Sequence, residues 1–204
     1  MSETNPNSRL EAFCDGVFAI ALTLLIIDIK IPSTEKINTT SELWLALKKI
    51  LPSVFAFLLS FIIILITWVN HHNSIKLVNR SSPSFIYANG FMLLTVVFTP
   101  FPTSLLGEYV LTDHAAPAVI LYNATLAMQA ISWILLTHSV LKGDLAKNEK
   151  AILKIRKNGN HAYFAFALYS ILAIVAIWFP LVIAIITTLT WIYWLIWGIQ
   201  IKHE

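Results

Sequence analysis

Five long segments of this chain are apolar and almost free of charge, and this pattern constrains its fold more than any other feature. A bilayer core about 30 Å thick requires about 20 consecutive apolar residues in a helix. The five segments have roughly that length and cover residues 50–69, 85–106, 115–141, 162–179 and 180–201. Charged residues make up 12% of the chain, whereas they make up about 25% of a typical soluble domain. We therefore predict an all-α integral membrane protein.

A sixth candidate segment, residues 10–31, comes first in the chain and differs from the others. It is apolar over residues 16–27 and is expected to end before Pro32, because proline disfavours helix in the residue that precedes it. Four charged residues lie near its two ends: Glu11, Asp15, Asp28 and Lys30. Charged side chains inside a spanning helix are costly and usually functional. We predict six transmembrane helices in a single domain comprising residues 1–204.

Lysine and arginine residues are distributed unevenly between the two sides of this six-helix arrangement. The side that would hold both termini has ten of them, and the other side has only Lys30, Lys36, Lys48 and Lys49. Because positive residues concentrate on the cytoplasmic side, we predict a multi-pass protein of the plasma membrane with both termini in the cytoplasm. The basic stretch 142–161 is expected to be a short connector without a core. It favours an orientation signal beside anionic lipid over a nucleic-acid site.

The first helix separates an apolar stripe from a polar face. On a helical wheel, an arc of roughly 100° contains the stripe, which consists of Ile20, Thr23, Leu24 and Ile27. Aliphatic residues at this spacing in a membrane helix more often contact lipid or the protein interior than line a pore. The stripe alone therefore does not establish a function.

Asp15 points away from the stripe and, close to membrane depth, requires a hydrogen-bond donor. Candidate donors at the same depth are Arg9, Asn70, His71, His72 and Asn73. One interpretation is a network of Arg9, Asp15 and one of the two histidines, and the other is a solvated polar helix end. A metal site is less favoured, because adjacent histidines point about 100° apart on a helix whereas paired zinc ligands usually lie at i and i+4.

The start of the first helix carries a motif, Arg9 followed after three residues by Phe13, Cys14 and Asp15, that leads directly into the stripe. It resembles the signature of the transmembrane protein 175 family of lysosomal and prokaryotic potassium channels. Family members have phenylalanine-serine-aspartate here, so Cys14 replaces a serine and is a weaker hydrogen-bond donor. The match extends over about twenty residues, and Trp68 with His71 and His72 at the end of the second helix also fits. The later helices match only in number and hydropathy.

This resemblance implies a homotetramer in membrane lipid, with a central potassium pore lined by the first helix. The ring nearest the cytoplasm would be Ile20, Thr23 or Leu24 would follow, and Ile27 would be outermost. The residues that would tie the helices together around the pore are Arg9, Phe13, Cys14, Asp15, Trp68, His71 and His72. The resemblance implies no enzyme activity, no nucleic acid, no cofactor and no protein-held metal, with potassium passing through the pore.

The chain lacks a Thr-Val-Gly-Tyr-Gly segment, so a ring of carbonyl groups is not expected to select the ion. A ring of aliphatic side chains would instead act as a hydrophobic gate, through its size and through loss of water. Potassium holds its water less tightly than sodium, so a modest preference for potassium is expected. The alternative function is a proton-coupled secondary transporter that uses Asp15 with His71 or His72. Against it, the chain has no pair of broken helices in matching halves.

Overall fold

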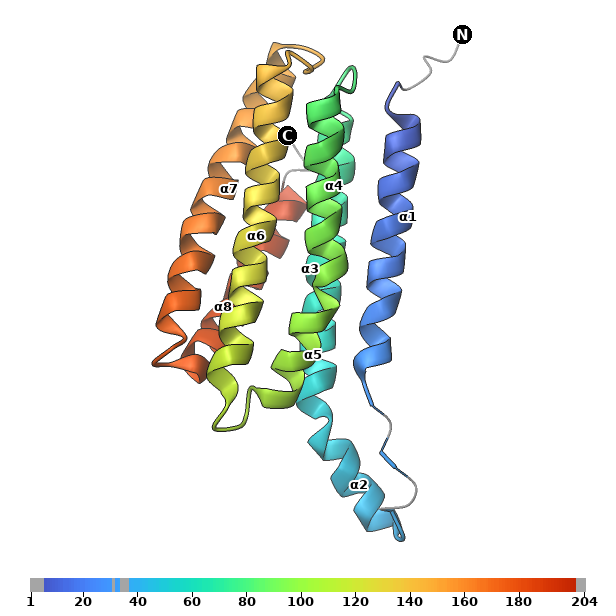
Figure 1. The fold of residues 1–204 in the computed structure, drawn as a ribbon, viewed down its shortest axis with the longest axis vertical. Helices are drawn as coiled ribbons and strands as arrows, with labels where there is room; N and C mark the ends of the chain where they lie inside the picture. Colours follow the sequence, from blue (N-terminus) through green and yellow to red (C-terminus); the bar gives the residue numbers. More distant parts are fainter. Residues whose placement is uncertain (1–5, 31, 34–36, 201–204) are drawn as a thin grey trace.

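The computed structural model describes residues 6–30, 32–33 and 37–200, except for the side chains of Asp28 and residues 197–200. Within these residues the chain forms eight α-helices and one short 3₁₀ helix (Figure 1). In chain order they are α1 (Ser8–Leu24), η1 (Leu25–Asp28), α2 (Thr40–Lys49), α3 (Leu51–Ile75), α4 (Pro83–Phe98), α5 (Pro100–Tyr109), α6 (Ala115–Lys142), α7 (Glu149–Val175) and α8 (Pro180–Gln200). The predicted all-helical class is therefore confirmed for the described part.

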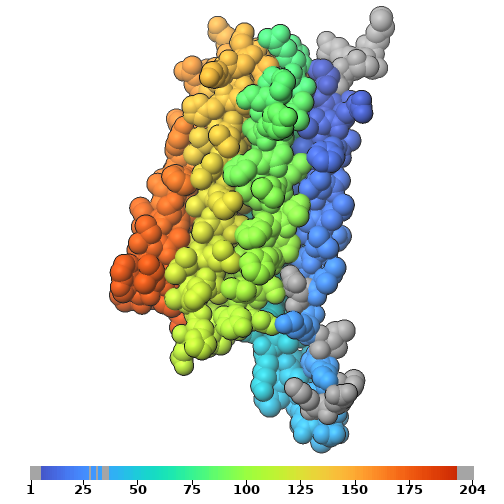
Figure 2. All heavy atoms as spheres, viewed as in Figure 1, coloured from blue at the N-terminus to red at the C-terminus, as the bar shows by residue number. Residues whose placement is uncertain are grey.

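The long helices lie side by side along the long axis of the molecule (Figure 1). Helix α1 packs against α3 and α4, whereas α6 packs against α4 and α7, and α8 packs against α3 and α6. Figure 2 shows that α1 lies at one edge of the molecule in this view, so that one of its sides is not covered by the other described helices.

In the described part of the chain, four helical stretches are long and apolar enough to cross a membrane. They are Ser8–Ile27, Leu51–Ile75, Pro83–Tyr109 and Ala115–Lys142, and Pro180–Ile196 is a shorter apolar helix. Many large apolar side chains on these helices are exposed, for example Ile62, Leu94 and Leu135. Exposed apolar surface on this scale is expected where lipid, rather than water, surrounds a protein. The chain is a multi-pass membrane protein.

Prolines and a change of helix type determine where two of the apolar segments break. The segment expected at residues 85–106 is divided between α4 and α5, and Pro100 begins the second of these helices. The first segment changes from α-helix to 3₁₀ helix at Leu25 and ends at Asp28, earlier than its expected end at residue 31. The helix therefore ends before Pro32 directly restricts it.

The prediction that residues 142–161 form a connector without a core is wrong. Helix α6 continues to Lys142, and α7 already begins at Glu149, where the side chain of Asn148 caps it by accepting a hydrogen bond from the Ala151 amide at 2.9 Å. Ile155 in this stretch is buried. Basic residues can occupy α7 because helix periodicity turns Arg156 and Lys157 away from the interior face.

Helix α2 was not expected from hydropathy, because it has no buried residue. A capping box begins it: the Thr39 hydroxyl accepts from the Glu42 amide, and the Glu42 carboxylate accepts from the Thr39 amide. In Figure 1, α2 extends beyond the end of the bundle, below α5. At this end, Lys30 forms an exposed ion pair of 2.6 Å with Glu108. Of the residues counted for membrane orientation, Lys36 and Lys202 lie outside the described residues.

Candidate functional site

Helix α1, together with the η1 turn that continues it, has one buried face and one exposed face, as its periodicity predicts. The buried side chains are Cys14, Phe18, Ala21 and Leu25, and each is at most 1% exposed. They join an apolar cluster with residues of α3 and α4. On the opposite face, Ile20 is 59% exposed, Leu24 38% and Ile27 70%. The stripe expected at a pore is therefore turned away from the interior of its own subunit.

Thr23 lies on the same exposed face, but its hydroxyl is already engaged. Its Oγ1 donates to the backbone carbonyl of Ile20 at 2.8 Å, within α1 itself. Leu24 is also exposed, so both side chains remain available to a lumen. The hydroxyl hydrogen is directed to the backbone, which leaves only the lone pairs of this oxygen for water or an ion.

Asp15 is connected to α3 through Trp68. The indole Nε1 of Trp68 donates to Oδ1 of Asp15 at 2.7 Å, and the aspartate is partly buried. Sequence reasoning singled out both residues but did not assign Trp68 as this donor. Arg9, one of the candidate donors named from the sequence, is exposed on the molecular surface. A charge-assisted hydrogen bond across two helices fixes the rotation of α1 relative to α3.

His72, one helical turn after Trp68 on α3, lies against both Trp68 and Glu11 of α1. Its ring stacks on Trp68 with the centroids 5.9 Å apart, and its Nδ1 lies 2.9 Å from Oε1 of Glu11. The distance is that of an ion pair, but the alignment is not that of a hydrogen bond. The attraction therefore depends on protonation of His72. Glu11 and Asp15 lie on one side of α1, so α3 contacts α1 at both carboxylates.

His71 faces a different partner, Asn89 of α4. The imidazole is 2% exposed, and its Nε2 lies 2.7 Å from Oδ1 of Asn89, whose amide nitrogen donates to the Phe85 carbonyl. Because the Asn89 oxygen must accept, the network assigns the proton to Nε2 of His71. The ring also packs against Phe18 at 5.4 Å. Sequence reasoning missed Asn89, although a polar residue in an apolar span signals a buried partner.

Cys14 and Phe13, the other residues of the motif, have opposite environments. Cys14 is fully buried in the apolar cluster of α1, α3 and α4, and its thiol is free. Its sulfur therefore packs as a small apolar group, which accounts for tolerance of cysteine where the resemblance implies serine. Phe13 is 62% exposed on the outer side of α1. Across the described residues, no three histidine, cysteine, aspartate or glutamate side chains gather as a metal site.

Comparisons with known proteins bear on the family of the chain. The model of the family described as "Endosomal/lysosomal potassium channel TMEM175" matches residues 9–100, which include nearly all of α1, the whole of α3 and the histidine pair. A potassium channel of Chamaesiphon minutus is 43% identical over 149 residues, which are 73% of this chain and 73% of that protein. A potassium channel of Streptomyces collinus is also 43% identical, over 63% of this chain and 64% of that protein.

The fold also matches a solved structure. The crystal structure of a lysosomal potassium-selective channel TMEM175 homologue from Chamaesiphon minutus has a TM-score of 0.84 and 33% identity. The match covers 96% of this chain and 99% of that chain. These family and structural neighbours are ion channels and not enzymes. The sequence motif, the two-faced first helix and these similarities lead to one conclusion: the chain belongs to the TMEM175 family.

Proposed function

We propose that this chain is one subunit of a homotetrameric potassium channel, in which α1 from each of four subunits lines a central pore. The observation that carries the proposal is the exposed aliphatic face of α1, opposite a face that is fully packed against α3 and α4. The potassium channels to which the chain is similar support the same function. In this arrangement the outer side of α1 meets its symmetry copies instead of lipid.

The narrowest part of the proposed pore is built from aliphatic side chains. Rings of Ile20 and Ile27, with Leu24 or Thr23 between them, offer no ligand to an ion, so passage depends on width and on loss of water from the ion. Potassium loses water more readily than sodium, which gives a modest preference for potassium. When the ring narrows, water leaves the constriction and conduction stops, so the same residues act as the gate.

The cytoplasmic end of α1 is proposed to hold this helix in position. Within the subunit, Asp15 is bound by Trp68, and His72 lies beside Glu11. Arg9 and Phe13 are exposed, and we assign them to contacts with neighbouring subunits around the axis. Both termini are placed in the cytoplasm of a plasma-membrane protein, because the basic residues gather on that side.

The transporter alternative is less well supported by the same contacts. A proton relay would require Asp15 and the histidines in one connected chain. Instead Asp15 pairs with Trp68, His71 with Asn89, and His72 lies beside Glu11. Flux into liposomes separates the two functions: a channel gives current that follows voltage, whereas a carrier gives saturable flux that requires a second gradient.

The decisive variant is Ile20→Asn. The amide would hydrogen-bond water in the constriction, so that ions would pass while losing less of their hydration water, and the preference for potassium would fall. We expect a conductance several-fold above that of the wild type, and a reversal potential between potassium and sodium solutions that moves toward zero. Ile171→Asn is the matched control, since Ile171 of α7 is 58% exposed, almost the same as Ile20. Wild-type conductance and selectivity in Ile20→Asn would exclude α1 from the pore.

A further inference from the structure

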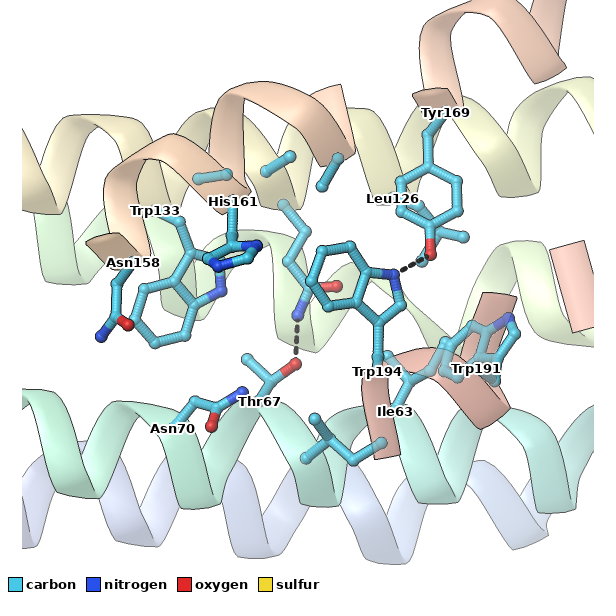
Figure 3. A pocket seen from close by; sticks show the side chains of 15 residues that line it. Ile63, Thr67, Asn70, Leu126, Trp133, Asn158, His161, Tyr169, Trp191 and Trp194 are labelled. Atoms are coloured by element: carbon cyan, nitrogen blue, oxygen red, sulfur yellow. Dashed lines mark hydrogen bonds between the residues drawn. The ribbon is translucent and has the colours of Figure 1, made fainter. Parts of the chain in front are cut away.

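One cavity bounded by the described residues lies away from α1. It has a volume of about 120 Å³ and lies between α3, α6, α7 and α8 (Figure 3). Side chains of all four helices line it, and none comes from α1. The proposed pore does not use this space.

The two ends of the cavity differ in polarity. Asn70, Asn158 and His161 lie toward one end and are partly exposed. Tyr169 and Trp191 lie toward the other end and are buried. The cavity therefore has a polar mouth and an aromatic interior, which suits an occupant with a polar head and an apolar body.

Two pairs of polar groups in the wall satisfy one another. Gln129 Nε2 donates to Thr67 Oγ1 at 2.7 Å, and Trp194 Nε1 donates to the Tyr169 hydroxyl at 2.9 Å. The indole N–H of Trp191, in contrast, is buried without a hydrogen-bond partner among the described residues. Trp191 also borders a second cavity of about 10 Å³, which is near the size needed for one water. The deep wall thus retains one donor that protein atoms do not satisfy.

Size and charge narrow the class of occupant. An engineered cavity of about 150 Å³ lined by apolar residues binds benzene, so this cavity is near the size for one aromatic ring. The lining contains no aspartate, glutamate, lysine or arginine. A charged occupant would lose its hydration without gaining a counter-charge, which is costly. Aromatic walls add favourable ring–ring contacts for an aromatic occupant.

We propose that this cavity is a binding site for a small uncharged amphiphile, whose aromatic ring lies among Tyr169, Trp191 and Trp194 and whose hydrogen-bonding head lies at Asn70 and Asn158. The site is distinct from the pore and does not depend on conduction. The cavity is connected to α1 through α3, because Thr67 lines the cavity and the next residue, Trp68, donates a hydrogen bond to Asp15 of α1.

The test uses the full chain in lipid nanodiscs, with 4-bromophenol as a neutral aromatic probe that quenches tryptophan fluorescence. We expect a saturable quenching component in the wild type. Ala162→Leu fills the cavity from α7 and should weaken this component by about tenfold or more. Ala167→Leu is the matched control, because it makes the same change on the same helix at an exposed position and should quench as the wild type does.

Ala130→Leu fills the same cavity from α6, so the test does not depend on the folding of a single variant. A charged analogue, 4-bromobenzylammonium, is expected to give no saturable component. The site is excluded by quenching that rises linearly without saturation in the wild type, or by equal affinity in both filled variants and the control. Saturable quenching by the charged analogue at equal affinity would overturn the assignment of an uncharged occupant.

Discussion

At the scale of single residues, the contact between Asp15 and Trp68 explains how a carboxylate is accommodated inside a spanning helix. The indole supplies one strong donor at 2.7 Å to a carboxylate that is only partly buried. The ring of His72 stacks on the same indole. A single tryptophan of α3 therefore contacts both Asp15 of α1 and His72 of α3.

Trp68→Phe should destabilise the protein, because it keeps an aromatic ring for His72 but removes the donor to Asp15. A lost hydrogen bond to a charged group costs about 1.5–3 kcal/mol, and the loss should appear in SDS-induced unfolding followed by circular dichroism. Trp178→Phe is the control, since Trp178 is 64% exposed and should have little effect. Equal stability of the two variants would show that the Trp68 hydrogen bond contributes nothing.

At the scale of helices, the close approach of α5 to α3 depends on a glycine. A Cβ atom placed on Gly107 would lie 2.6 Å from the Cα atom of Ser53, which is a backbone contact that a side chain cannot relieve by rotating. In the same region the hydroxyl of Ser60 lies 2.6 Å from that of Thr103 and 3.1 Å from that of Tyr122. The hydroxyl contacts hold α5 and α6 against α3 where Gly107 permits the contact.

Gly107→Ala should therefore force α5 away from α3 and lower the free energy of unfolding by about 1–3 kcal/mol. Gly90→Ala serves as the matched control, because a Cβ atom on Gly90 meets nothing within 4 Å. Alanine is the better helix former, so this control should be stabilising by about 0.5–1 kcal/mol. The same unfolding assay measures both, and an equal change in the two variants would contradict the close-contact explanation.

Helix α2 depends on a capping carboxylate with a defined pH dependence. Hydrogen bonds from the Asn38 and Thr39 amides lower the pKa of Glu42 below its ordinary value of 4.5. Because the folded-state pKa is lowered, the stabilisation is complete above the ordinary value and is lost as pH falls through the lowered one.

The amide NMR shifts of Asn38 and Thr39 should therefore titrate with a midpoint below 4.5. In Glu42→Gln, which keeps an acceptor but cannot ionise, this titration should disappear. A midpoint at or above 4.5 in the wild type would mean that these amides do not hold the carboxylate.

At the scale of the whole molecule, the subunit has a packed side and an open side. One buried cluster joins α1 to α3 and α4. The other joins α3 to the four helices α5, α6, α7 and α8. The outer face of α1 lies at the edge of the subunit (Figure 2). In the proposed channel, copies of α1 from other subunits cover this face, so the channel depends on assembly.

Native mass spectrometry of the purified protein should give four times the subunit mass of 23.0 kDa. The tetramer is expected because copies of α1 around a shared axis cover the exposed faces with one another. Ile171→Asn, on a face assigned to lipid, should keep this mass. A monomer or a dimer at concentrations where potassium current is recorded would contradict a four-fold pore.

The fold class followed from the sequence because hydropathy is a local property of each segment. Apolar runs without charge form helices in a membrane whatever their neighbours are, and the motif with Arg9, Phe13 and Asp15 indicated the family. The threonine–glutamate pair at Thr39 and Glu42 has the spacing of a capping box, but no helix was predicted there from it. Hydropathy also gave no signal for α2, because that helix buries no side chain.

Only the tertiary structure decided which partner each polar group has. Trp68 is 53 residues from Asp15, and no local pattern distinguishes it from the five candidate donors near the same depth. Asn89 as the partner of His71, the start of α7 inside a basic stretch, and the cavity between α3, α6, α7 and α8 likewise depend on how the helices pack. Hydropathy acts through one segment at a time, whereas a hydrogen bond between helices requires that their packing bring two particular side chains together.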